Sequence, residues 1–244
     1  MNKTTQLKKL LLQRKALPCP GVYDALSARM VEYCGFQACQ ISGFGVSASS
    51  LGMTDASFTS LEEIVRITSN IVRAVDIPVM TDADTGYGNA VNVWWTTKRL
   101  EETGAAGMNL EDQCFPKRCG HMAGKQLISL EEMVGKIRAA VDAKRDPDFV
   151  INARTDAAYV CGIEEAIRRG NAYLEAGADM VFVESPASAE EVKRAIEQIK
   201  GPVSINMLEG GRTPMLTFEE LRQLGAARVS CPMFTSLIAA YALQ

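Results

Sequence analysis

The feature that most constrains this chain is a unit that recurs along its length: an amphipathic helix, a glycine or turn, a short apolar strand and then a polar residue. The helices of these units are predicted at 24–34, 60–75, 89–103, 129–143, 163–176, 188–200 and 217–224. The strands that follow them are predicted at 36–41, 77–80, 107–110, 149–151, 180–183, 203–205 and 228–230. Glycine after a helix supplies the left-handed cap that other residues resist. Short apolar strands between helices indicate a parallel sheet that is covered on both faces.

The number of units points to a closed barrel. With a first strand near 17–20, the chain holds eight strand–helix units in 244 residues, which is typical of a TIM-type (β/α)8 barrel. The rival is a doubly wound open sheet, which more often has about five or six strands and a glycine-rich first turn. The two GxG segments here, 43–45 and 86–88, lack the third glycine of a dinucleotide-binding turn. We therefore expect an α/β chain that forms a single barrel domain over residues 1–244.

Charge and cysteine content exclude several function classes. Lys and Arg total 26 against 29 Asp and Glu, and no basic block is long enough to follow a phosphate backbone, so we expect no nucleic-acid partner. The uncharged stretch 33–54 is rich in Gln, Ser and Gly, so we expect no membrane span. The seven cysteines show no CxxC spacing and the amino terminus has no apolar signal core. Both features are typical of a reduced, cytoplasmic protein.

Polar residues follow the predicted strands, at the end of a TIM barrel where active sites lie. They are Ser42, Asp82 with Asp84, Glu111 with Asp112, Arg154, Glu184 and Asn206. Carboxylates that converge on one mouth repel one another unless a cation lies among them. All-oxygen ligands, in a chain with one histidine, favour Mg²⁺ or Mn²⁺ over zinc.

Helix capping is the alternative explanation for these carboxylates. Asp is a good N-cap residue, and we expect Asp112 and Asp156 to cap the helices that follow them. Capping explains Asp82 and Asp84 less well, because their spacing puts both side chains on the same side of an extended strand end.

The segment 111–121 is long for a connection between a strand and a helix, and it holds the only histidine, His121. Cys119 lies two residues from His121 and two from Lys117, and a nearby cation favours a thiolate. Such a thiol is suited to act as a general acid or a nucleophile, and the length of the loop favours a lid over the site. The alternative is a surface loop with a chance cysteine.

The segment 117–121, Lys-Arg-Cys-Gly-His, resembles the signature loop of the isocitrate lyase and phosphoenolpyruvate mutase superfamily. Further blocks resemble that family in the same order along the chain: 20–24, 42–43, 82–88, 111–113, 152–156 and 206–207. The resemblance implies a TIM-like barrel that binds Mg²⁺ and makes or breaks C–C or P–C bonds in small 2-oxo or 2-hydroxy acids. It also implies a homo-oligomer, a tetramer or a dimer. The chain stops at Gln244, where family members usually continue into helices exchanged between subunits, so we expect truncated or absent C-terminal helices and a weaker case for that assembly.

The resemblance assigns roles to individual positions. The metal site is assigned to Asp84 as direct ligand, with Asp82 and Glu111 holding metal-bound waters. The catalytic positions are Cys119 as general acid, its loop companions Lys117 and His121, Arg154 and Glu184, which orient substrate and loop, and Asp55. The substrate-binding positions are Ser42, Gly43, Asn206, Arg154, Cys119, Gly120 and His121.

The cysteine favours lyases within the superfamily, and the segment 206–214 resembles that of dimethylmalate lyase and oxaloacetate acetylhydrolase types. We expect a Mg²⁺-dependent carbon–carbon lyase that cleaves a small 2-hydroxy di- or tricarboxylate, such as a substituted malate or 2-methylisocitrate, to a 2-oxo acid and a carboxylate. The alternatives are a phosphonomutase or an oxaloacetate hydrolase on the same scaffold, or a barrel without catalytic activity.

Overall fold

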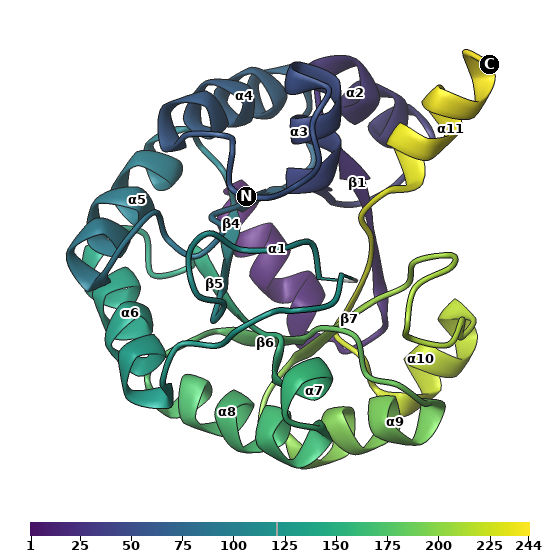
Figure 1. Ribbon diagram of the computed structural model, residues 1–244. Helices are drawn as coiled ribbons and strands as arrows, with labels where there is room; N and C mark the ends of the chain where they lie inside the picture. Colours follow the sequence, from purple (N-terminus) through teal and green to yellow (C-terminus); the bar gives the residue numbers. More distant parts are fainter. Residues whose placement is uncertain (121) are drawn as a thin grey trace.

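The computed structural model describes residues 1–120 and 122–244 and shows a closed barrel of parallel strands in chain order, β1 to β8 (Figure 1). The strands are Leu17–Val22, Cys39–Ile41, Val79–Asp82, Gly107–Glu111, Val150–Thr155, Met180–Val183, Val203–Asn206 and Arg228–Cys231. Each strand pairs with the next, and β1 closes the barrel against β8 with Leu17 opposite Arg228. The predicted (β/α)8 fold is confirmed.

Helices surround the barrel (Figure 1). They are α1 (Lys3–Leu12), α2 (Ala25–Tyr33), α3 (Gly43–Leu51), α4 (Leu61–Ala74), α5 (Ala90–Glu102), α6 (Leu130–Ala143), α7 (Ala157–Val160), α8 (Ile163–Glu175), α9 (Ala189–Gln198), α10 (Phe218–Leu224) and α11 (Phe234–Ala242). The predicted helices match α2, α4, α5, α6, α8, α9 and α10 to within a few residues. Helices α1, α3, α7 and α11 were not predicted. None of the described helices is long and apolar enough to cross a bilayer.

Helix α4 shows how the sequence forms these elements. Ser60 caps its amino end by accepting from the Glu63 N–H, and the Glu63 carboxylate accepts from the Ser60 N–H in return. Ile64, Ile67 and Ile71 recur on one face of the helix and are buried against the barrel.

Helix α1 closes the amino end of the barrel. Its Leu7 and Leu11 are buried in a cluster with residues at or just before the starts of the strands, among them Leu17, Val150 and Met180. Figure 1 shows α1 lying across the barrel axis. Because α1 fills this end, we expect a ligand to enter at the other end, where the strands finish.

Candidate active site

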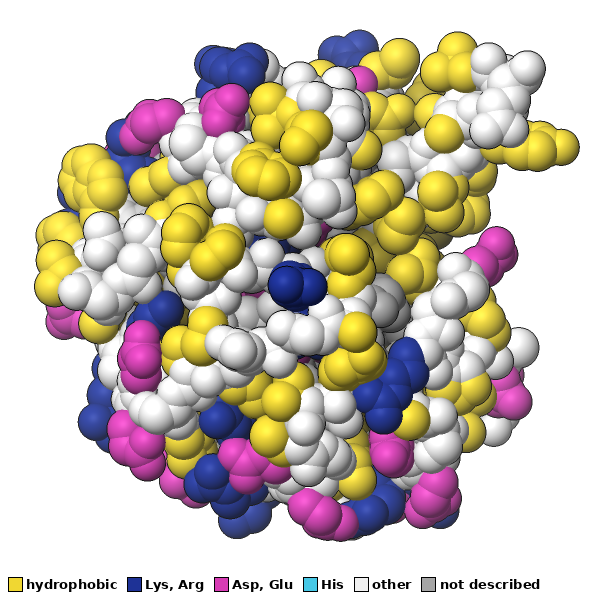
Figure 2. Space-filling view, viewed as in Figure 1, with side chains coloured by type: hydrophobic (Ala, Val, Ile, Leu, Met, Phe, Trp, Pro, Cys, Tyr) yellow, Lys and Arg dark blue, Asp and Glu magenta, His cyan; other side chains and the backbone are white. Residues whose placement is uncertain are grey.

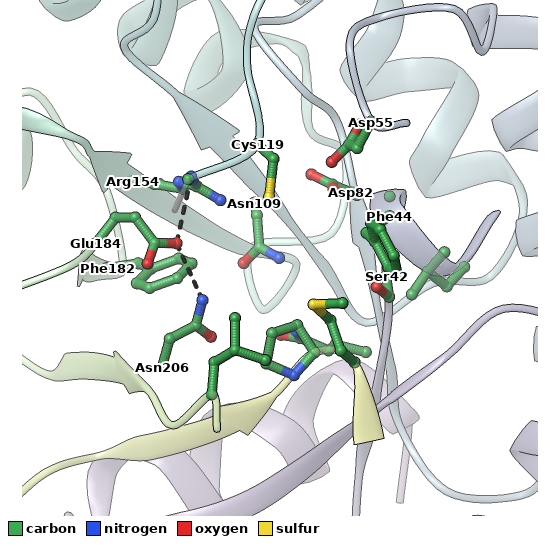
Figure 3. A pocket seen from close by; sticks show the side chains of 17 residues that line it. Ser42, Phe44, Asp55, Asp82, Asn109, Cys119, Arg154, Phe182, Glu184 and Asn206 are labelled. Atoms are coloured by element: carbon green, nitrogen blue, oxygen red, sulfur yellow. Dashed lines mark hydrogen bonds and ion pairs between the residues drawn. The ribbon is translucent and has the colours of Figure 1, made fainter. Parts of the chain in front are cut away.

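A pocket opens where the strands end. Polar side chains from several strand ends point into it (Figure 3). The predicted site residues that line it are Ser42, Gly43, Asp55, Asp82, Cys119, Gly120, Arg154, Glu184 and Asn206. Asp84, Glu111 and Lys117 are buried and contact residues of this wall. His121 lies outside the described residues.

The amino end of α3 forms one side of the cavity. The Ser42 hydroxyl caps this helix by accepting from the Gly45 N–H at 3.1 Å. A Cβ at Gly43 would lie only 2.6 Å from Asp82 Oδ2, so a larger residue there would displace this carboxylate. The first N–H groups of a helix have no partner within it, and at Gly43 and Phe44 this end borders the cavity. The arrangement is suited to a substrate carboxylate.

Lys117 joins the long loop to the carboxylates of the mouth. Its ammonium lies 2.7 Å from Asp55 Oδ2 and 2.9 Å from Asp84 Oδ1. Burial lowers the pKa of Lys117, but the surrounding carboxylates, Asp84 and Glu111 foremost, raise it well above its ordinary value. Lys117 therefore stays charged and neutralises part of the negative charge of this cluster.

The backbone at the end of β3 differs from the extended form that the spacing of Asp82 and Asp84 suggested. Asp84 has φ of +46°, in the left-handed region, so the chain turns there rather than continuing as a strand. The Asp84 N–H donates to Asp82 Oδ1 at 3.3 Å within this turn. Burial, and to a lesser degree Asp82 and Asp55, raise the pKa of Asp84 to about 6, against the lowering effect of Lys117.

Arg154 lies at the centre of a second ion-pair cluster. Its guanidinium is 3.2 Å from Glu111 Oε2, 3.2 Å from Glu184 Oε2 and 2.9 Å from Asp156 Oδ2. Burial lowers the pKa of Arg154, but these carboxylates raise it more. The Asn206 amide donates to Glu184 at 3.0 Å, which fixes that carboxylate in turn (Figure 3). Arg154 is thus a permanent, oriented cation on the pocket wall.

The buried carboxylates fit a hard divalent cation. Glu111 Oε1 is buried without a hydrogen-bond partner among the described residues, and burial raises the pKa of Glu111 well above its ordinary range although Arg154 lowers it. An added positive charge would therefore stabilise the ionised forms of Glu111 and Asp84. Within residues 1–120 and 122–244, no three Asp, Glu, Cys or His side chains are grouped so that they could share one ion. Mg²⁺ is commonly held by one or two carboxylates and several waters, which requires no such group.

The loop over the pocket is fixed at both of its ends. The Gln113 side chain donates to the Arg118 carbonyl at 2.9 Å and accepts from the Arg118 N–H at 3.0 Å. The buried Lys125 ammonium donates to the Gly120 carbonyl and lies 2.6 Å from Asp156 Oδ1. A Cβ at Gly120 would overlap the side chains of Arg154 and Glu184, so a larger residue there would displace these side chains or the loop. The anchoring roles of Gln113 and Lys125 were not predicted.

Asp112 and Asp156 do not have the capping roles that were expected. Helix α7 begins after Asp156, but no hydrogen bond from that side chain caps it, because the carboxylate pairs with Arg154 and Lys125 instead. The fully buried Asp112 carboxylate accepts from Thr155, from Tyr173 and from the Asp156 N–H, and it pairs with Arg169. Helix α6 is capped by Ser129.

The sequence matches known proteins over nearly its whole length. A family model described as phosphoenolpyruvate phosphomutase matches residues 7–244. A 2,3-dimethylmalate lyase of Eubacterium barkeri is 50% identical over 225 residues, which cover 92% of this chain and 78% of the relative. A 2-methylisocitrate lyase of Aeropyrum pernix is 44% identical over 229 residues, which cover 94% and 73%.

Solved structures agree with these matches. A crystal structure of 2,3-dimethylmalate lyase superposes with a TM-score of 0.95 at 36% identity, covering all of this chain and 82% of that one. Phosphonopyruvate hydrolase in complex with oxalate and Mg²⁺ superposes with a TM-score of 0.89 at 32% identity, covering 100% and 84%. In these relatives the same barrel serves both carbon–carbon lyase and phosphonate chemistry.

Proposed function

Because this chain belongs to the phosphoenolpyruvate mutase family, within the isocitrate lyase superfamily, and is a carbon–carbon lyase, we propose that it cleaves a substituted malate. The substrate class is a small 2-hydroxy di- or tricarboxylate of the 2,3-dimethylmalate or 2-methylisocitrate type. The products are pyruvate or another 2-oxo acid and a second carboxylate. Residues 1–244 act as one catalytic domain in this proposal.

One observation carries the proposal: Cys119, on the loop over the pocket, lines the same cavity as Arg154 and Asp82. The reaction needs a cation to hold a carboxylate and an acid to protonate carbon. Figure 3 shows the thiol directed into the pocket between Arg154 and the Asp55–Asp82 pair. A thiol with an ordinary pKa of about 8.5 is a suitable general acid near neutral pH.

Asp84, with Asp82 and Glu111, would hold Mg²⁺ or Mn²⁺. The ion supplies charge that polarises the 2-hydroxyl and its neighbouring carboxylate. The support for this assignment is the burial of Asp84 and Glu111 and Glu111 Oε1, which has no hydrogen-bond partner among the described residues.

The residues of the chain supply the remaining steps. The substrate 2-hydroxyl loses its proton to a base, C2 becomes a carbonyl as the C2–C3 bond breaks, and the electron pair remains on C3, delocalised into its carboxylate. Arg154 stabilises that negative charge, and the amino end of α3 at Gly43 holds the other carboxylate. Cys119 then donates a proton to C3. Lys117, paired with Asp55 and Asp84, holds the loop in register with the mouth.

The surface and the cysteines support two further parts of the proposal, a homo-oligomer and a cytoplasmic location. Helix α11 has no buried residue, and with α2 it borders an apolar groove that Phe234, Ile238 and Met30 line. Figure 2 shows hydrophobic side chains gathered in this region. This exposed apolar face supports a homo-oligomer, which light scattering would test against a monomer. The cysteines form no disulfide in the structure, which supports a cytoplasmic enzyme.

A substrate panel tests the activity. 2,3-Dimethylmalate, 2-methylisocitrate, citramalate, oxaloacetate and phosphonopyruvate are incubated with enzyme and Mg²⁺, and release of 2-oxo acid or oxalate is followed. The proposal requires the highest kcat/KM on a substituted malate or 2-methylisocitrate. Turnover of phosphonopyruvate or oxaloacetate alone would assign the chain to the hydrolase alternative, which the match to phosphonopyruvate hydrolase supports. No turnover on any of the five would contradict both.

A further inference from the structure

The interior of the barrel carries a polar layer below the pocket. Bulky branched apolar residues dominate the interior of TIM barrels. Here Asn109, Asn152, Ser204 and Arg228 are buried together and linked by hydrogen bonds. A departure from the apolar pattern at such a cost in desolvation is typical of a functional position.

Arg228 is a fully buried cation that donates to neutral groups. Its guanidinium donates to Ser204 Oγ at 2.9 Å, contacts Met80 Sδ at 2.9 Å and lies 3.4 Å from Asn109 Oδ1. In the described part of the chain, no carboxylate oxygen lies within the 4.0 Å of an ion pair with it, in contrast to Arg154 and Arg169. A buried charge that lacks a close ion pair is costly in free energy, which supports a functional role for Arg228.

Arg228 determines which way the Asn109 amide faces. A guanidinium can only donate, so the Asn109 atom that it contacts has to be the oxygen. Asn152 Nδ2 donates to the same oxygen at 2.7 Å. Arg228 and Asn152 thus both donate to Oδ1. Asn109 Nδ2 remains available to donate into the pocket, which Asn109 lines. Figure 3 shows this amide in the middle of the pocket, its oxygen toward Phe182 and its nitrogen on the side of Phe44 and Ser42.

We propose that Asn109 donates its side-chain amide to an anionic oxygen of the bound substrate, and that Arg228 is the positioning residue that holds this amide. The inference rests on the proposed function and deepens it, because it assigns the floor of the pocket to a carboxylate or enolate oxygen. Neither residue belongs to the motifs that suggested the active site.

The test measures binding of oxalate in the presence of Mg²⁺ by calorimetry, beside melting temperatures and kinetics. Asn109→Leu should weaken oxalate binding by about 10- to 100-fold, the range for loss of a hydrogen bond to a charged group. Arg228→Met should weaken it by about tenfold and raise KM more than it lowers kcat. Because Arg228 acts through Asn109, the double variant should bind oxalate within about twofold of Asn109→Leu alone.

Two further variants keep the test decisive. Thr68→Val removes a buried hydrogen bond to Thr81. Neither threonine lines the pocket, so the variant should lower the melting temperature without changing oxalate binding. If Arg228→Met does not fold, Asn109→Asp serves instead: its carboxylate can pair with Arg228 but offers no donor, so oxalate binding should fall at least about tenfold without a loss of stability.

Unchanged oxalate binding in Arg228→Met, fully additive losses in the double variant, or Asn109→Asp binding like the wild type would each overturn the inference while leaving the lyase proposal intact. A wild-type enzyme that binds oxalate through Asn109 but cleaves none of the panel would overturn the lyase proposal alone. A wild-type enzyme that does not bind oxalate would overturn the inference about the pocket floor.

Discussion

Lys117 Nζ lies 2.9 Å from Asp84 Oδ1, so a loop residue directly contacts the carboxylate that we assign to the metal. The same ammonium contacts Asp55, which lines the pocket. The position of the loop and the charge state of the mouth are therefore linked. Any change that adds or removes charge at Asp84 alters the attraction that holds Lys117, and with it Cys119 two residues later.

Metal dependence is the first consequence to test. Activity should be lost in EDTA and should return with Mg²⁺ or Mn²⁺. Burial raises the pKa of Asp84 and of Glu111 although nearby cations lower it, so a bound metal ion would stabilise the ionised form of both carboxylates. Asp84→Ala should abolish turnover, and calorimetry should show loss of Mg²⁺ binding with the fold intact by circular dichroism. Full activity in chelator would contradict the metal assignment.

Cys119→Ser separates protonation from binding. Serine is nearly the same size but is far too weak an acid at neutral pH, so kcat should fall at least about 10²-fold, as expected when a positioned general acid is removed. The dissociation constant of oxalate should change little. Cys161→Ser, at an exposed cysteine, is the matched control and should retain the wild-type kcat. Near wild-type cleavage by Cys119→Ser would support the phosphonomutase or hydrolase alternative.

The loop 113–125 should respond to its anchor, Lys125. In the wild type, oxalate with Mg²⁺ should slow protease cleavage in this segment. Lys125→Met removes the contacts with Gly120 and Asp156, so cleavage there should be faster both with and without ligand. Lys144→Met, which breaks an ion pair with Asp179 elsewhere on the barrel, should leave the loop cleavage rate unchanged. Equal rates in all three proteins would exclude an anchoring role.

The loss of stability caused by Asp156→Asn should depend on pH, because Asp156 forms buried ion pairs. Burial raises the pKa of Asp156, but Arg154 and Lys125 together lower it by more. The pKa in the folded protein therefore lies below the ordinary value of about 3.9. Its stabilising contribution is therefore present above pH 4 and is lost as pH falls through the folded pKa. At pH 7 the variant should melt at least about 6 °C lower, since breaking a buried pair costs about 3–5 kcal/mol. The difference in melting temperature between the wild type and the variant should become smaller below about pH 4. A constant gap would contradict this account, and Asp142→Asn, at an exposed hydrogen bond to Trp94, serves as control.

The barrel was predictable because its signals are local. Each glycine after a helix and each short apolar run lies within a few residues of the element that it defines, and the strand ends face one another in any parallel barrel. Helix α3 was missed because Gly43–Leu51 is rich in glycine and serine and reads as a loop. Its caps are local, Ser42 at the start and Gly52 at the end, but the apolar periodicity that usually marks a helix is weak.

The candidate site was predictable only in part. The residues at strand ends could be named from the pattern, whereas partners in the folded protein could not. Lys117 and Asp55 are 62 positions apart, and Asn109 and Arg228 are 119 apart. Asp112 reads as a helix cap because it follows a strand, yet it binds Tyr173 and Arg169, which lie on a helix two units further along the chain. Which side chains meet depends on how the strands are placed in the closed barrel. Sequence periodicity does not reveal this for individual side chains.

Helix α1 closes the amino end of the barrel, so we expect the pocket to have one entrance. We expect substrate to enter and both products to leave past the same loop. The two products would then share one exit and be released in order. We therefore expect the fragment bound near Asn109, at the floor, to leave last and to compete with the next substrate molecule, and the fragment nearer Cys119 to leave first. Product-inhibition patterns would record this order: competitive for the deeper fragment and noncompetitive for the outer one.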